Sequence, residues 1–141
     1  MKNMAVLIDT NIILDWLLDR ESFPHHAEQV MRLCIDGKIQ GYLASHSILN
    51  IFYITRKDFS ISDRRDMLLL LCNRFEIIGI DYQMLMAVLN NDNFKDIEDG
   101  LQIQCAEDEN LDYIVTRNIK DFGTSKIKAF LPEEFLRILN I

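Results

Sequence analysis

The chain contains 141 residues, of which 49% are hydrophobic, and its formal net charge at pH 7 is −7. This length predicts a single domain, residues 1–141, with one substantial core, and the composition excludes an intrinsically disordered tail. The acidic charge disfavours a nucleic-acid-binding protein with a broad basic face, although a divalent cation bound among the carboxylates would offset part of that charge.

Targeting signals and cysteine pairs are not found in the sequence. No apolar run approaches the roughly 18 residues that span a bilayer, and no secretory-signal pattern is seen, so we expect a cytoplasmic protein without membrane association. Cys34, Cys72 and Cys105 occur singly, without Cys-x-x-Cys spacing, which disfavours both a disulfide framework and a zinc site. We expect all three to be small buried hydrophobic side chains in a reducing compartment.

Short apolar runs alternate with segments of helical spacing along the chain. The apolar runs predict strands at residues 4–8, 41–44, 76–80 and 112–116, with a small edge strand at 127–130. The segments between them predict helices at residues 12–18, 24–37, 45–53, 67–75, 81–91, 98–109 and from 132 onward. Pro24 and Pro132 mark helix starts and Gly37 a helix stop, while Ser45 and Ser60 are expected to cap the helices that follow them.

This alternation indicates right-handed βαβ units. We expect an α/β fold, a three-layer α/β/α sandwich around a central, mainly parallel sheet. In such a sheet, sites form beyond the carboxyl ends of the strands, where the strand order reverses. Asp9 follows the first strand, Asn118 and Asp121 follow the fourth, and residues 96–99 begin the helix that leads into the fourth strand. These positions predict one acidic cleft on a common rim of the sheet.

The carboxylates of this rim suggest a metal site. Converging carboxylates repel one another unless a cation lies between them. Oxygen ligands without a paired His or Cys suit Mg²⁺ or Mn²⁺, ions that activate water and stabilise the leaving oxygen in phosphodiester cleavage. Asp96 and Asp99 would lie one turn apart on a common helix face, whereas Glu98 would point about 100° away from Asp99 and is the weaker ligand candidate.

Each of these residues also has a purely structural interpretation. Asp9 could cap the helix that follows it, and Asp96 or Asp99 could stabilise the positive end of a helix. Asp121 could be an ordinary turn residue, and Asn118 could occupy a left-handed turn position. The position of all of them on one rim favours the interpretation as a site.

The histidines are weaker candidates for this site. His25 and His26 are adjacent and follow Pro24, so both are expected at the surface. His46 follows the second predicted strand and is a minor candidate for the cleft. The sequence has no glycine-rich phosphate loop and no Gly-x-Ser-x-Gly elbow.

Four motifs, in order, carry a family resemblance that covers essentially the whole chain. They are Asp9-Thr10-Asn11-Ile12-Ile13-Leu14-Asp15, Glu98-Asp99-Gly100-Leu101-Gln102, Ile114-Val115-Thr116-Arg117-Asn118-Ile119-Lys120-Asp121-Phe122 and Leu131-Pro132-Glu133-Glu134-Phe135-Leu136. Together they resemble the PIN domain family, and in particular its branch that includes VapC-like toxin nucleases.

The resemblance implies an endoribonuclease that hydrolyses RNA with Mg²⁺ or Mn²⁺ as cofactor. It also implies a homodimer and, for the toxin of a type II toxin–antitoxin pair, a small antitoxin protein that blocks the cleft. The catalytic residues carried over from the family are Asp9, Asp99 and Asp121. The expected metal ligands are Asp9, Asp96, Glu98, Asp99 and Asp121, and the supporting polar residues are Thr10, Asn11, Asn50, Thr116 and Asn118.

One position departs from the family pattern. Many members carry a glutamate in the helix after the second strand, where this chain has Asn50. Asparagine offers a neutral oxygen but no charge and no base, so a catalytically weak or inactive PIN-like domain that binds RNA or protein is the alternative hypothesis. A phosphorylation-dependent receiver domain is a third, but receivers need adjacent acids after the first strand, and here Thr10 and Asn11 follow Asp9.

Overall fold

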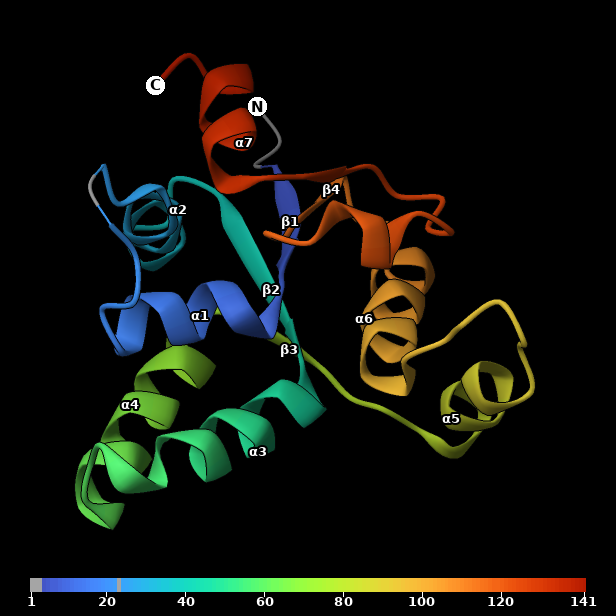
Figure 1. Cartoon of the computed structure of the whole chain (residues 1–141), viewed down its shortest axis with the longest axis horizontal. Helices are drawn as coiled ribbons and strands as arrows, with labels where there is room; N and C mark the ends of the chain where they lie inside the picture. The colour runs from blue at the N-terminus through green and yellow to red at the C-terminus, as the bar shows by residue number, and fades with distance from the viewer. Residues whose placement is uncertain (1–3, 23) are drawn as a thin grey trace.

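The computed structural model describes residues 4–22 and 24–141. Its centre is a five-stranded parallel sheet with the strand order β3-β2-β1-β4-β5 (Figure 1). The strands are Ala5–Ile8 (β1), Gln40–Ala44 (β2), Glu76–Ile78 (β3), Tyr113–Val115 (β4) and Ala129–Phe130 (β5). Each lies within two residues of a predicted boundary, and the predicted α/β fold with a parallel sheet is confirmed.

Helices cover both faces of this sheet. The α-helices are Thr10–Leu17 (α1), His26–Ile35 (α2), Ser45–Ile54 (α3), Ile61–Arg74 (α4), Tyr82–Leu89 (α5), Ile97–Asp108 (α6) and Pro132–Ile138 (α7). Two short 3₁₀ helices are Thr55–Lys57 (η1) and Ile119–Phe122 (η2). In Figure 1, helices α1 to α4 and α7 lie on one side of the sheet and α5 and α6 on the other, which confirms the predicted three layers.

Two apolar cores, one on each face, follow from the alternation of side chains along β1. Val6 and Ile8 pack with α1, α2, α3, α4 and α7, whereas Ala5 and Leu7 pack with α5 and α6. Because β1 is buried on both faces and pairs with β2 and β4 on its two edges, it occupies the middle of the sheet. The residue that follows it, Asp9, therefore lies at the centre of the carboxyl edge.

Three local predictions differ from the structure. Ser45 is the first residue of α3 rather than its cap, because β2 runs directly into the helix and Ala44 takes the capping position. The α4 helix begins at Ile61, six residues before the predicted start, since its first turns are polar and mostly exposed and show no apolar periodicity. Ser60 does cap it, accepting a hydrogen bond from the Asp63 amide at 3.1 Å. Cys72 is exposed rather than buried, unlike Cys34 and Cys105.

The other end signals behave as predicted. Gly37 lies just beyond α2 with a φ of +76°, a left-handed conformation that favours glycine. Pro24 precedes α2, which starts two residues later at His26, and Pro132 is the first residue of α7. Among the described residues, no helix is both long and apolar enough to cross a membrane.

Candidate functional site

Asp9 forms the floor of the predicted cleft. It directly follows β1 and is 3% exposed, and its amide donates to the Val115 carbonyl at the end of β4 (3.0 Å). Asp9 occupies the N-cap position of α1, as its structural interpretation expects, but its carboxylate makes no capping hydrogen bond to the helix. Instead Oδ1 accepts from Gln102 Nε2 and Oδ2 from Thr116 Oγ1, each at 2.9 Å. Burial raises the pKa of Asp9, and these neutral donors only partly oppose the rise.

Two hydroxyl groups connect this floor to its surroundings. The buried Thr116 hydroxyl donates to Asp9 and accepts from the Asn118 amide (3.0 Å), so it couples the first strand to the loop after β4. Asn118 has a φ of −122°, which contradicts a left-handed turn position. Thr10 Oγ1 lies 2.7 Å from Ser47 Oγ, a buried hydrogen bond that joins the start of α1 to α3.

Asp99 and its acidic neighbours gather on one rim at the start of α6. Partial burial is the largest cause of a rise in the pKa of Asp99 from 3.8 to about 7. The remainder comes from four negative charges, those of Asp96, Asp9, Asp121 and Glu98. The other four predicted acidic residues are therefore all within electrostatic range of Asp99, as the strand-end argument requires.

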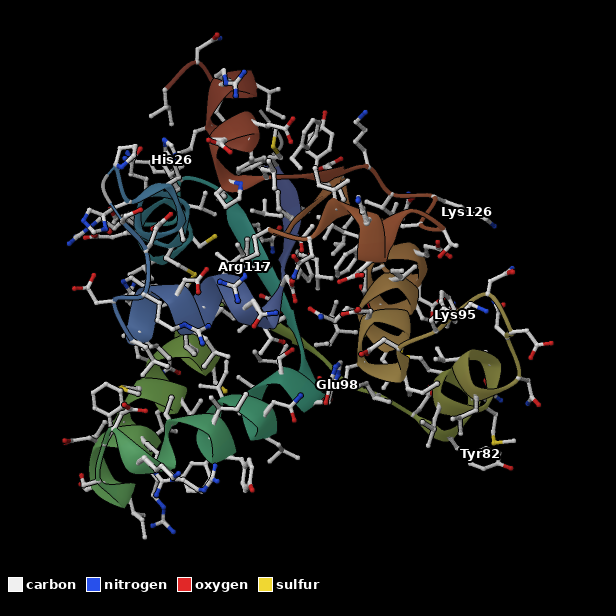
Figure 2. The ribbon with its side chains drawn as sticks, viewed as in Figure 1. His26, Tyr82, Lys95, Glu98, Arg117 and Lys126 are labelled. Carbon is white, nitrogen blue, oxygen red and sulfur yellow. The ribbon has the colours of Figure 1, made fainter. Side chains whose placement is uncertain are left out.

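The acids differ in their local tasks. Asp96 is the N-cap of α6, and its Oδ1 accepts from the Asp99 amide at 3.0 Å, so its structural interpretation is confirmed. Asp121 lies in η2, a 3₁₀ turn that follows Asn118, and its side chain is exposed. Glu98 is also exposed and lies beside the junction of β2 and α3, facing away from the loop that carries Lys95 (Figure 2).

A pocket of about 260 Å³ opens beside this rim. Asp96, Asp99 and Asp121 line it together with Phe94, Lys95 and Lys120. Within the described part of the chain, neither lysine forms an ion pair, although three carboxylates line the same pocket. The pocket therefore presents unpaired charges of both signs.

The acids lie near Asp99, but they are not arranged as a set of ligands around one metal ion. In the chain from residue 4 onward, Phe23 excepted, no three His, Cys, Asp or Glu side chains are arranged tightly enough to hold a metal ion. Carboxylates without a counterion repel one another, and one oxygen of Asp96 is occupied by capping. The donor set still fits a hard cation, because it offers only oxygen ligands and because the ionised form of Asp99 is destabilised by its neighbours.

Asn11 and Asn50, both predicted as supporting polar residues, lie on helices α1 and α3. Asn11 lies in the first turn of α1, and its backbone and that of Thr10 face the Asp9 carboxylate closely enough to lower its pKa slightly. Asn50 is half-buried on α3, one turn after His46, and its side chain has no hydrogen bond among the described residues.

His26 lies near Glu133 of α7, with 3.9 Å between Nδ1 and Oε2, well away from α6 (Figure 2). Its neighbour His25 is half-buried just before α2 rather than on the open surface.

Gln102 was not predicted as part of the site, and His46 was only a minor candidate for it. Gln102 is 2% exposed and holds Asp9 through its amide nitrogen, while its Oε1 is buried without a hydrogen-bond partner among the described residues. His46, a minor candidate, lies near Glu98, Asp9 and Asp96. Gln102 follows Asp99 by three residues, so helical spacing places both on one face and could have identified it.

A further missed pair involves Asp15, the second buried aspartate of the region. Its carboxylate accepts from Arg117 Nη1 (2.9 and 3.1 Å) and lies 3.1 Å from Arg20 Nη2. Figure 2 shows Arg117 beside α1, although it belongs to the loop after β4. This ion pair therefore fixes the loop that carries Asn118 and Asp121.

Known proteins resemble this chain in sequence and fold. A family profile described as "PIN domain" matches residues 5–120. The chain is 28% identical over 142 residues to the protein named Ribonuclease VapC1 from Aquifex aeolicus (strain VF5), covering 96% of this chain and 95% of that protein. A toxin–antitoxin complex from Klebsiella pneumoniae superposes with a TM-score of 0.68 at 22% identity, covering 90% of this chain and 97% of that one. The complex VapBC2 from Rickettsia felis, bound to a promoter DNA fragment, gives 0.66 at 19% identity, with coverages of 91% and 98%. At these identities, the solved structures show a shared fold.

Proposed function

The chain belongs to the PIN domain family, and from this premise we propose that it is a metal-dependent endoribonuclease in which Asp9, Asp99 and Asp121 are the catalytic carboxylates. The observation that carries the proposal is the approach of Asp9, Asp96, Glu98 and Asp121 to Asp99 at one edge of the sheet, where their charges add to burial in raising the pKa of Asp99. A protein gains nothing in stability from such mutual repulsion. A bound cation would turn the repulsion into attraction, so the arrangement favours a ligand-binding role.

The proposed ligands for Mg²⁺ or Mn²⁺ are Asp9, Asp99 and Asp121, with Asp96 and Glu98 near enough to contribute charge. When bound, such an ion supplies an activated water and neutralises charge on the phosphate. Gln102 and Thr116 hold both oxygens of Asp9 in place before the ion arrives. Such fixed carboxylates avoid the cost of ordering a ligand during binding.

The pocket beside the acids suggests how RNA is held. Lys95 and Lys120 line it without a carboxylate partner, so both are free to contact phosphate groups on either side of the scissile bond. Two local cations provide the backbone contacts that the net charge of −7 does not provide elsewhere. We propose that RNA enters along this pocket towards Asp99 and Asp121.

We further propose that the protein acts as a toxin. The similarity to a protein named Ribonuclease VapC1 and the fold shared with toxin–antitoxin complexes support a toxin with a small antitoxin partner, acting as a homodimer. Exposed apolar side chains on α3 and α4, namely Leu49, Tyr53 and Leu69, provide a surface for a protein partner.

A non-catalytic RNA- or protein-binding module is the second candidate, and Asn50 favours it. This residue supplies no charge at a position where many family members carry glutamate. The two candidates share the cleft but differ in turnover, so cleavage separates them.

The deciding experiment measures cleavage of a fluorescent single-stranded RNA with Mn²⁺ and with EDTA. We expect Mn²⁺-dependent cleavage by the wild type and a loss of about 100-fold or more in Asp99→Asn. Asp108→Asn is the matched control, because it changes an exposed aspartate at the far end of the same helix. Binding of RNA without cleavage, unchanged by Asp99→Asn, would favour the binding module instead.

A further inference from the structure

Two polar groups without partners flank Asp9. The buried side-chain atoms that lack a hydrogen bond among the described residues are Gln102 Oε1, both ring nitrogens of His46, and Arg64 Nε. The first two residues lie near Asp9: Gln102 of α6 is hydrogen-bonded to it, and His46 at the start of α3 is within electrostatic range of it. Buried polar atoms are almost always satisfied, so their coincidence at one place indicates something that binds there.

The orientation of Gln102 is fixed by Asp9. Its Nε2 donates to Asp9 Oδ1 at 2.9 Å, and the reverse orientation would place an amide oxygen against a carboxylate oxygen. Oε1 must therefore remain an acceptor, and it has no donor among the described residues. What is missing at this position is a hydrogen-bond donor.

His46 faces the same region. Burial lowers its pKa, while the charge and backbone of Glu98 and the charges of Asp9 and Asp96 act in the opposite direction. Its ring is close to three carboxylates and yet has no hydrogen bond of ordinary geometry. A neutral imidazole has one donor nitrogen and one acceptor nitrogen, and the Glu98 backbone is an acceptor close enough to the ring to raise its pKa. The second nitrogen, like Gln102 Oε1, is then an acceptor without a donor.

We propose that Gln102 and His46 hold a hydrated divalent cation at Asp9 by accepting hydrogen bonds from water molecules bound to that cation. Mg²⁺ keeps several of its waters in protein sites, and those waters are strong donors. Residues that hydrogen-bond to metal ligands are a major part of metal affinity. Through these hydrogen bonds, two neutral side chains contribute metal affinity that a carboxylate at position 50 would otherwise provide. The inference rests on the proposed function, since it requires the cation.

The test is calorimetry of Mn²⁺ binding to the apo protein, which needs no RNA cleavage. Gln102→Met keeps the size of the side chain and removes its polar atoms, and we expect a Kd about 10–100-fold weaker. His46→Leu removes the ring nitrogens, and we expect about a 10-fold loss. His46→Gln restores an acceptor and is expected to bind within about threefold of the wild type.

Matched controls separate this effect from damage to the fold. Gln104→Met changes the neighbouring glutamine of α6, whose amide donates to Asp108, and His26→Leu changes a histidine beside α7. Both are expected to bind Mn²⁺ as the wild type does. Thermal unfolding in EDTA shows whether each variant is folded.

The outcomes distinguish the two proposals. If the wild type binds Mn²⁺ and both Gln102→Met and His46→Leu match it, this inference is overturned and the nuclease proposal stands. If only Gln102→Met weakens binding, Gln102 acts solely by positioning Asp9, which also overturns it. If the wild type binds no Mn²⁺, both the proposed metal-dependent function and this inference are overturned. Should Gln102→Met not fold, the pair His46→Leu and His46→Gln decides alone.

Discussion

Two buried aspartates, Asp9 and Asp15, lie six positions apart in the chain, and they have opposite kinds of partner. Asp15 is 7% exposed and meets two arginines, Arg117 at 2.9 Å and Arg20 at 3.1 Å. Asp9 is 3% exposed, and its side-chain partners are the neutral amide of Gln102 and the hydroxyl of Thr116. Burying a charge is unfavourable unless the charge is paired. Asp15 has a counterion, whereas Asp9 has none among the described residues.

This difference separates a structural carboxylate from one prepared for a ligand. The ion pair of Asp15 with Arg117 ties α1 to the loop after β4, and with Arg20 nearby the negative charge of Asp15 is fully compensated. The neutral donors at Asp9 fix its oxygens but leave its negative charge, to which Asp99 and Asp121 add. We infer that the missing counterion is the cation of the proposed nuclease.

The largest effect is expected at Asp9. Asp9→Asn removes the charge and keeps the shape, so RNA cleavage should fall about 100-fold or more while the fold is preserved. Initial rates with saturating Mn²⁺, together with circular dichroism, measure both quantities. Cleavage that is retained within about twofold in a folded Asp9→Asn protein would remove this residue from the site.

Asp15→Asn should show the reverse pattern. Because Arg20 and Arg117 are 38% and 45% exposed, water can solvate the arginines left behind, and the loss in the free energy of unfolding should be about 1–2 kcal/mol. Urea unfolding followed by circular dichroism measures this loss. Cleavage should decrease far less than in Asp9→Asn, through looser placement of Asp121. Loss of cleavage as large as in Asp9→Asn, with an unchanged free energy of unfolding, would contradict a structural role for Asp15.

The pH dependence of stability should expose the unbalanced charge directly. The pKa of Asp99 in the folded protein, about 7, lies above its ordinary value of 3.8, so the folded state binds more protons between these two values. Without a cation, stability should therefore fall as the pH rises through this window, and the raised pKa of Asp9 acts in the same direction. Bound Mn²⁺ should reverse the trend, because the ionised carboxylates then bind the cation.

Thermal unfolding from about pH 5 to pH 8, in EDTA and in Mn²⁺, measures this dependence. Asp99→Asn should flatten the slope in EDTA, whereas Asp108→Asn should leave it as in the wild type. Equal slopes in all three proteins would show that the acids of the rim do not repel one another.

The same contrast explains what could be predicted from sequence. Strand β1 and the position of Asp9 after it were predictable, because a strand buried on both faces is a continuous apolar run that ends at its first polar residue. Asp99 and Asp121 followed from the rule that sites lie at the carboxyl ends of strands. The start of α4 was not predictable, since Arg64 is buried within a mostly exposed polar turn and breaks the periodicity.

The pairing of each aspartate with its partner could not be predicted from sequence, even though helical spacing places Gln102 on the same face of α6 as Asp99. Gln102 meets Asp9 across 93 positions and Arg117 meets Asp15 across 102. No local pattern encodes such a pairing, which depends on how α6 and the loop after β4 pack against β1. Asn50 and His46 occupy successive turns of α3, so their relation to the acids also becomes visible only when α3 is placed.

The smallest expected effect concerns the positive charges that the chain leaves unpaired. Lys120 lines the pocket with Asp99 and Asp121 but has no ion pair, in contrast to Arg117 three residues earlier, which is bound to Asp15. Lys120→Ala should weaken RNA binding by about 2–5-fold and lower the slope of log K against log salt by about 1, because one phosphate contact is lost. Fluorescence anisotropy over a range of salt concentrations, with Ca²⁺ in place of Mn²⁺ to slow cleavage, measures both. Lys38→Ala is the control, since Lys38 precedes β2 at the opposite edge of the sheet. An unchanged slope in Lys120→Ala would mean that RNA reaches the acids without passing this lysine, and that its lack of a partner has no functional cause.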